Sequence, residues 1–216
     1  MHVVLASASP ARLSILRAAG LDPLVEVSEV DEDALLAAVP DATPAEKVTT
    51  LAGAKATTVA RRIGAVDAVV IGCDSMLHVH GALVGKPADA DEARARWRGM
   101  AGGTGELVTG HAVLRLVDGE IDRVAEGHAV TVVRFGEPTD AELDAYLGTG
   151  EPLRVAGAFT LDGFGGWFVE GVDGDPSNVV GISLPLTRRL LAGVGVAVTD
   201  LWRSVDVASD RPAASD

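Results

Sequence analysis

The sequence predicts an α/β protein, and three stretches carry this prediction. Residues 3–6 and 69–73 are short apolar runs of the kind that form strands buried on both faces. Residues 43–62 begin with a Thr-Pro-Ala-Glu capping box and then space their apolar side chains at helical intervals. The chain of 216 residues suits one large domain or two small lobes.

The first predicted strand leads through a polar turn into a helix. Ser9 is a good N-cap, Pro10 suits the first helical position, and Gly20 marks the end. The free N–H groups and positive dipole of such a helix start favour an anion, to which Ser7 and Ser9 offer hydroxyls and Arg12 a guanidinium. The alternative is an ordinary capped helix whose Arg12 points to water, and the motif favours neither.

A cluster of acidic side chains follows a second predicted strand over residues 24–27. Its members are Glu29, Asp31, Glu32 and Asp33. Clustered carboxylates at a strand end could bind a cation. The commoner structure is a solvated helix start, in which Asp31 caps the helix.

Lys55 lies on the apolar face of the helix that the capping box opens, in register with Val48 and Val59. A lysine in that position must extend its ammonium to water or meet an anion in a cleft. The spacing slightly favours extension to water.

The rest of the chain is organised around the apolar run over residues 69–73, which stops at Asp74. A carboxylate at the carboxyl end of a buried strand stands where α/β proteins place their ligands. Lys86 follows, between a glycine and a proline. An acid and a lysine at one strand end form a candidate site for a metal-bound polyphosphate. We expect Cys73 to be a small buried residue rather than a nucleophile.

The remaining segments continue the alternation of strands and helices. We expect hairpins over residues 77–84 and 106–135, helices over 91–100, 140–148 and 184–192, a glycine-rich segment over 155–180 and a frayed tail over 205–216. Nothing in the sequence indicates a linker or an internal repeat, so we expect residues 1–204 to form a single domain.

The composition excludes several classes of partner. A net charge of −13 disfavours binding to polymeric nucleic acid. No apolar run reaches the ~20 residues of a membrane span, and the N-terminus lacks the features of a signal peptide. The single cysteine excludes an internal disulfide and fits a reducing compartment. We therefore expect a cytoplasmic protein with no membrane partner.

A series of short blocks appears in order along the chain. They are Leu5-Ala-Ser-Ala-Ser-Pro-Ala-Arg12, Val30-Asp-Glu32, Leu51-Ala-Gly-Ala-Lys-Ala56, Ile71-Gly-Cys-Asp-Ser75, Gly85-Lys-Pro87, Ala156-Gly-Ala-Phe159 and Gly174-Asp-Pro-Ser-Asn-Val-Val-Gly181. In this order and spacing they resemble the motifs of the Maf family of nucleoside triphosphate pyrophosphatases, over residues 5 to about 191.

The resemblance implies a mixed, curved sheet flanked by helices, with two lobes around a deep cleft. It implies cleavage between the α- and β-phosphates of a nucleoside triphosphate, with Mg²⁺ or Mn²⁺ as cofactor. Asp74 matches the family's general base, and Ser7, Glu32, Lys55 and Lys86 match other active-site positions. From the chemistry of the residues, Glu32 and Asp74 could hold the metal, while Lys55, Lys86 and Arg12 could offset the developing phosphate charge. Because family members often form dimers, a homodimer is also expected.

The chain departs from the family pattern at positions linked to base preference. Ala11 replaces an arginine, Ser75 replaces a threonine, and Asp162 stands where one branch has glutamine. The base therefore stays open between dTTP or UTP, 7-methyl-GTP and other modified nucleotides. Two alternative functions remain at this stage. One is a purine house-cleaning enzyme similar to inosine triphosphatase, and the other is a nucleotide-binding regulator of cell division without turnover.

Overall fold

A computed structural model describes residues 1–64 and 67–202. In this part of the chain seven strands form one mixed sheet in the order β2-β1-β3-β5-β6-β7, with β4 pairing separately on β3. The strands are β1 (His2–Leu5), β2 (Leu24–Val25), β3 (Ala68–Val79), β4 (Ala82–Val84), β5 (Thr104–Val117), β6 (Glu120–Phe135) and β7 (Val169–Asp173). β1 is parallel to β2 and β3, and the later pairs are antiparallel.

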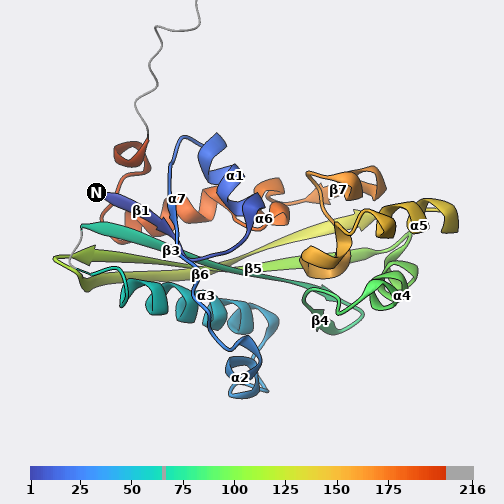
Figure 1. The fold of residues 1–216 in the computed structure, drawn as a ribbon, viewed down its shortest axis with the longest axis horizontal. Helices are drawn as coiled ribbons and strands as arrows, with labels where there is room; N and C mark the ends of the chain where they lie inside the picture. The colour runs from blue at the N-terminus through green and yellow to red at the C-terminus, as the bar shows by residue number, and fades with distance from the viewer. Residues whose placement is uncertain (65–66, 203–216) are drawn as a thin grey trace, which may run out of the picture.

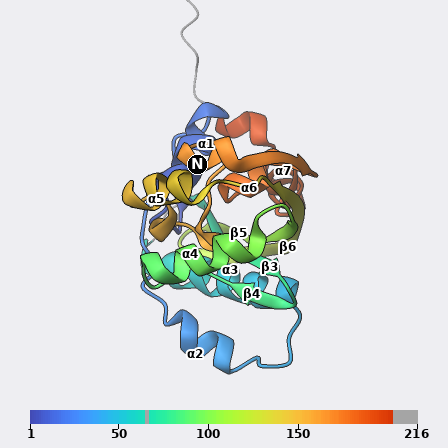
Figure 2. The same ribbon diagram turned by 90° about the vertical axis from the view of Figure 1, so that its right-hand side faces the viewer.

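Helices cover both faces of this sheet, as Figures 1 and 2 show. α3 runs along one face, whereas α1, α6 and α7 lie on the other. The helices are α1 (Pro10–Ala18), α2 (Glu32–Ala37), α3 (Pro44–Ala60), α4 (Ala90–Met100), α5 (Asp140–Gly148), α6 (Pro176–Val180) and α7 (Leu184–Gly193), and the 3-10 turns are η1 (Pro152–Arg154), η2 (Ala156–Ala158), η3 (Phe164–Phe168) and η4 (Val198–Leu201). The predicted α/β class, with a mixed, curved sheet flanked by helices, is confirmed.

The helix starts follow from local hydrogen bonds that the sequence predicts. Ser9 caps α1 and Asp31 caps α2, and each side chain accepts an N–H of the first turn. Thr43 opens α3 with a complete capping box, and Thr139 opens α5 in the same way. Each cap satisfies N–H groups that a helix start otherwise leaves without a partner, which is why these boundaries could be predicted.

α3 packs unusually close to the sheet because two glycines face it. A Cβ added at Gly72 on β3 would stand 2.3 Å from the carbonyl oxygen of Ala52, and one at Gly110 on β5 would stand 2.1 Å from that of Val48. Both oxygens belong to the α3 backbone, so no side chain separates helix and strand here. This close contact brings residues of α3 within reach of side chains on β3.

The core consists of three apolar clusters. One lies between the sheet and the α1–α7 side, and the second lies between the sheet and α3. The third gathers side chains of α4, α5, the 3-10 turns and the ends of the long strands, with Trp97 fully buried among them. The predicted division into two lobes around a deep cleft stays a prediction, and the expected tail over residues 205–216 lies outside the described residues.

One boundary predicted from the sequence is wrong. β3 does not end at Asp74 but continues to Val79, where it turns through His80 and Gly81 into β4. The apolar pattern ends at Asp74, whereas the hydrogen-bond ladder continues, because β5 pairs with β3 from Ala68 to His78. The carboxylate is therefore carried by a rigid strand interior rather than by a loop.

Candidate active site

Lys55 joins two carboxylates that lie far apart in the sequence. Its Nζ lies 2.5 Å from Oδ1 of Asp74 and 2.8 Å from Oε1 of Glu32. Lys55 is 9% exposed and Asp74 6% exposed, while the Glu32 side chain is half exposed. Lys55 therefore does not extend to water, and the interpretation that its spacing slightly favoured is wrong.

Each member of this triad comes from a different element. Glu32 is the first residue of α2, Lys55 lies in the fourth turn of α3, and Asp74 lies in β3 on the face that α3 covers. Asp74 follows Gly72 by two residues on that face, so the close approach of α3 at Gly72 brings Lys55 to it.

Burial raises the pKa of the Asp74 carboxyl above its ordinary value of 3.8. The positive charges of Lys55 and Arg12 act in the opposite direction, and the negative charge of Glu32 adds to the effect of burial. A carboxylate whose proton affinity has been raised is a stronger base than an exposed one. The site therefore holds a group suited to accept a proton from water.

The backbone next to Asp74 is an open border of the sheet. β1 pairs with β3 only as far as Ile71, and β4 pairs with it only from Leu77 onwards. Residues 72–76 therefore have a neighbouring strand on the β5 side alone. The side chains of Asp74 and Ser75 point to opposite faces of the sheet. A single ligand could therefore contact both of them only by lying across this open edge.

The Arg12 side chain lies against this open border, on the face of the sheet to which Ser75 points. Its guanidinium donates to the hydroxyls of Ser7 and Ser75 at 2.9 Å each, to the Cys73 carbonyl at 2.9 Å and to the Gly181 carbonyl at 2.8 Å. The alternative in which Arg12 points to water is wrong. Its position ties the first turn, β3 and the end of α6 together.

Ser7, Ser9 and Ser75 have distinct structural partners near this guanidinium. Ser7 is buried and also accepts the backbone N–H of Ser9, while the Ser9 side chain caps α1. Ser75 shares a hydrogen bond of 2.9 Å with Thr109 on β5. These contacts gather three predicted substrate-binding serines around Arg12.

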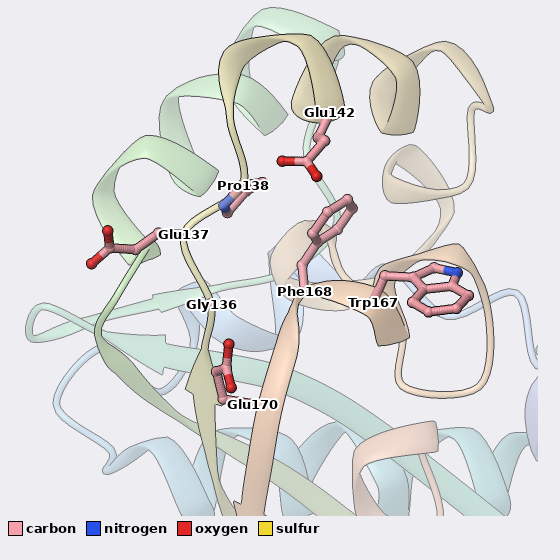
Figure 3. A pocket seen from close by; sticks show the side chains of 7 residues that line it. All are labelled: Gly136, Glu137, Pro138, Glu142, Trp167, Phe168 and Glu170. Atoms are coloured by element: carbon pink, nitrogen blue, oxygen red, sulfur yellow. The ribbon is translucent and has the colours of Figure 1, made fainter.

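The other predicted site residues are not brought into this cluster. Lys86 is exposed and forms no hydrogen bond or ion pair with the residues described. Asp162 lines a pocket with Glu151, Phe164 and Trp167. A neighbouring pocket beside Trp167, drawn in Figure 3, is lined by Gly136, Glu137, Pro138, Glu142, Phe168 and Glu170 and contains none of the predicted site residues.

Sequence reasoning missed buried polar residues behind the site. Asn178 donates from Nδ2 to the Leu107 carbonyl and to the Thr131 hydroxyl, at 3.1 Å each, so that α6 is fixed on β5 and β6. His111 accepts the Ser183 N–H at 2.8 Å, and burial lowers its pKa to about 4, which keeps the ring neutral. Asn178 belongs to one of the blocks that carry the family resemblance, and no local signal marks His111.

Cys73 is buried, as expected, and burial raises its thiol pKa to about 11. A thiol that stays protonated is a poor nucleophile. The predicted burial of Cys73 is confirmed.

The donor chemistry of the triad fits a hard divalent cation. Mg²⁺ is commonly held by one or two carboxylates, with substrate phosphates and water completing its shell. Glu32 and Asp74 supply two such carboxylates at one point. Over residues 1–64 and 67–202, no group of three or more acidic, histidine or cysteine side chains could hold a metal alone. In the same ranges, no helix is long and apolar enough to cross a membrane.

Comparisons with known proteins agree over nearly the whole chain. The Maf-like protein family matches residues 2–194. The nucleoside triphosphate pyrophosphatase of Saccharopolyspora erythraea is 64% identical over 205 residues, which cover 94% of this chain and 97% of the relative. Proteins of the same name from Rhodococcus jostii and Nocardia farcinica are each 60% identical, covering 93% of this chain and 96% of the relative.

Proposed function

Because this chain belongs to the Maf family, we propose that it is a nucleoside triphosphate pyrophosphatase. It hydrolyses the bond between the α- and β-phosphates and releases a nucleoside monophosphate and pyrophosphate. The observation that carries the proposal is the contact of the buried Lys55 with the buried Asp74 and the half-exposed Glu32, beside an open sheet border. The relatives that match nearly the whole chain bear the name of this activity.

Asp74 has the environment that a general base requires. Its carboxyl is buried and its pKa is raised, so it accepts a proton more readily than a surface carboxylate. In the proposed reaction it takes the proton from the attacking water. Lys55 holds Asp74 in place and lies beside the point at which phosphate charge develops.

The positive groups around the border would bind the triphosphate chain. Arg12 donates to four protein acceptors, so it would contribute mainly its positive charge to phosphate binding. The hydroxyls of Ser7 and Ser75, which accept from Arg12, lie beside that charge. Ser9 begins α1, whose N-terminal dipole favours an anion. Lys86 is exposed, and we propose that it turns toward the phosphates when substrate is bound.

Glu32 and Asp74 are the proposed ligands of Mg²⁺ or Mn²⁺. When bound, such a cation would neutralise phosphate charge as a Lewis acid. Its remaining ligands would be phosphate oxygens and water, since the described residues offer only the two carboxylates at this point. Asp162 is retained as a proposed contact to the base, in the pocket beside Trp167.

Product analysis tests this function directly. Purified protein is incubated with Mg²⁺ or Mn²⁺ and with each standard triphosphate, 7-methyl-GTP, 5-methyl-CTP, pseudo-UTP or ITP. Monophosphate plus pyrophosphate is expected, and the Asp74→Asn variant should lose about 10²- to 10⁴-fold in rate. The fastest base would then identify the substrate class.

Two outcomes would contradict the proposal. Orthophosphate plus diphosphate would mean that the enzyme cleaves the other bond. Triphosphate binding without turnover would favour the nucleotide-binding regulator. Fastest turnover of ITP would keep the reaction but favour the purine house-cleaning enzyme.

A further inference from the structure

The loop that carries Lys86 follows directly on β4, at the open border of the sheet. β4 runs antiparallel to β3 and ends where Val84 pairs with Leu77. The open border, residues 72–76, begins one residue beyond this pair. Residues 85–88 therefore leave β4 beside that border. Figures 1 and 2 show α4 next to β4 at this end of the long strands.

The start of the loop lies on the face of the sheet to which Asp74 points. A Cβ added to Gly85 would stand 3.5 Å from the terminal methyl of Met76. Met76 follows Asp74 by two residues in β3, so both side chains lie on the same face. Lys86, the next residue of the loop, is exposed and forms no hydrogen bond or ion pair with the residues described. Its ammonium can therefore turn toward a ligand at the border if the loop backbone stays in place.

Two side chains of α4 hold this loop at both ends. Arg96 donates to the Gly85 carbonyl at 2.6 Å, and the Glu92 carboxylate accepts the Ala88 N–H at 2.6 Å. Glu92 and Arg96 lie one turn apart on α4 and form an ion pair with each other. We call this pair the α4 clamp. It fixes the two residues between Gly85 and Ala88 from both sides.

The surroundings of the α4 clamp indicate a role beyond the stability of the helix. An ion pair one turn apart on a helix contributes little to stability where water surrounds it. Here the Arg96 side chain is only 14% exposed and the Glu92 side chain 41% exposed. The hydrogen bond from the Ala88 N–H, followed by that from Arg96, lowers the pKa of the Glu92 carboxyl below its ordinary value. Each charged group thus uses a further bond to hold the backbone of the loop.

A second donor ties the Gly85 carbonyl to the buried structure around β3. The Gly157 N–H donates to this oxygen at 3.1 Å. Gly157 has a φ of +73°, and a Cβ there would stand 2.8 Å from the Leu77 side chain. The carbonyl of the next residue, Ala158, accepts the indole N–H of the buried Trp97 at 2.7 Å. The loop is therefore anchored to α4 and β3 together.

We propose that Glu92 and Arg96 are positioning residues, which hold the Gly85-Lys86-Pro87 loop so that the Lys86 ammonium reaches the phosphates at the open border. This inference rests on the proposed function, because that function gives Lys86 its task. The α4 clamp acts through the backbone of the loop and does not itself contact the substrate. A small displacement of a group that binds the reacting phosphates is costly in rate, so loss of the α4 clamp reduces turnover.

Hydrogen exchange tests the α4 clamp without reference to activity. Glu92→Ala removes the acceptor of the Ala88 N–H, and Arg96→Met removes the charge that holds this acceptor in place. In both variants the Ala88 N–H should exchange at least about tenfold faster than in the wild type. Arg94→Met is the matched control, since Arg94 lies on the same helix but pairs with Asp144 of α5. Its exchange at Ala88 should match the wild type.

A double-mutant cycle tests whether the α4 clamp acts through Lys86. With the triphosphate that the wild type hydrolyses fastest, Arg96→Met should lower kcat/KM by about tenfold. In the Lys86→Met background the same change should cost less than about twofold, because the group that it positions is already absent. Arg94→Met should have little effect in either background. Arg96→Lys keeps one donor, should retain more activity than Arg96→Met, and replaces it in the cycle if Arg96→Met fails to fold.

Three results would overturn the proposal, and they are distinguishable. Additive losses from Arg96→Met and Lys86→Met would overturn it while the proposed function stands. Unchanged exchange of the Ala88 N–H in both clamp variants would show that Glu92 and Arg96 do not hold the loop. A wild type that releases no pyrophosphate from any triphosphate would overturn the proposed function, and the positioning role with it.

Discussion

Lys55 and Asp74 form a buried ion pair between the centre of α3 and the interior of β3, with Nζ 2.5 Å from Oδ1. The same ammonium lies 2.8 Å from Glu32, so one cation compensates two carboxylates. An unpaired charge in this environment would be costly, because little water reaches it. The lysine thus occupies the place between the two proposed metal ligands.

This arrangement predicts that metal binds weakly until nucleotide arrives. Removing the ammonium with Lys55→Met should free the two carboxylates and tighten Mn²⁺ binding, without nucleotide, by about tenfold, equivalent to ~1.4 kcal/mol. Electron paramagnetic resonance of free Mn²⁺ measures this directly. Lys47→Met, on the same helix, is the matched control, since Lys47 forms no ion pair among the described residues. Equal Mn²⁺ affinity in all three proteins would contradict the prediction.

The same Lys55→Met variant should be less stable than the wild type. Removing one partner of a buried ion pair lowers the free energy of unfolding by ~3–5 kcal/mol. We expect a loss at the lower end of this range because the Glu32 side chain is half exposed. Urea unfolding monitored by tryptophan fluorescence gives the free energy. The Lys47→Met control should unfold like the wild type.

Activity should rise with pH as the Asp74 carboxyl loses its proton. Burial raises the pKa of this carboxyl above 3.8, and only the ionised form can accept a proton. The logarithm of kcat/KM should therefore increase with unit slope until pH exceeds the raised pKa, and then level off. If kcat/KM instead levelled off above the ordinary pKa of an aspartate, the pKa of Asp74 would not be raised.

The stabilising contribution of the Asp74 carboxyl should change with pH in the opposite direction, falling as the pH rises. The folded protein holds the Asp74 proton more tightly than the unfolded chain does. The contribution of this group to stability is therefore present below the unfolded pKa and is lost as pH rises through the raised folded pKa. Comparing urea unfolding of the wild type and Asp74→Asn across this range isolates the effect, because the variant lacks the titrating group.

Arg12 should tolerate no conservative replacement. Its guanidinium spans four acceptors on three separate segments, which a single ammonium nitrogen cannot do. Arg12→Lys should lower the free energy of unfolding by about 2 kcal/mol or more and reduce turnover. Arg17 lies on the same helix as Arg12 and forms an exposed ion pair with Asp22. The control variant Arg17→Lys should therefore have little effect on stability. Wild-type stability of Arg12→Lys would show that the network is not structural.

The close approach of α3 predicts a strong effect of a single methyl group. Gly110→Ala would place a Cβ 2.1 Å from the Val48 carbonyl oxygen and push the helix away from the sheet. We expect a loss of about 1–3 kcal/mol in stability together with reduced activity. The control is Gly148→Ala at the end of α5, where no atom outside the adjoining helix backbone lies within 4 Å of the new methyl. A stable, fully active Gly110→Ala variant would mean that the contact does not position Lys55.

The sequence by itself determined the elements whose boundaries depend on near neighbours. The caps at Ser9, Asp31 and Thr43 were predicted correctly because each bond joins residues three positions apart. The family motifs identified Lys55, Glu32 and Asp74 as members of one site, and the structure brings these three together. Nothing in their local spacing shows that one ammonium joins both carboxylates.

Only the tertiary structure decided how the site residues face one another. Helical spacing placed Lys55 on an apolar face but left its ammonium free to reach water, and the contact at Gly72 turned it toward Asp74 instead. The end of the apolar run resembled a strand end, yet pairing with β5 carries β3 past Asp74. The physical reason is that periodicity reports which face of an element is buried, whereas the partner on that face comes from segments distant in sequence.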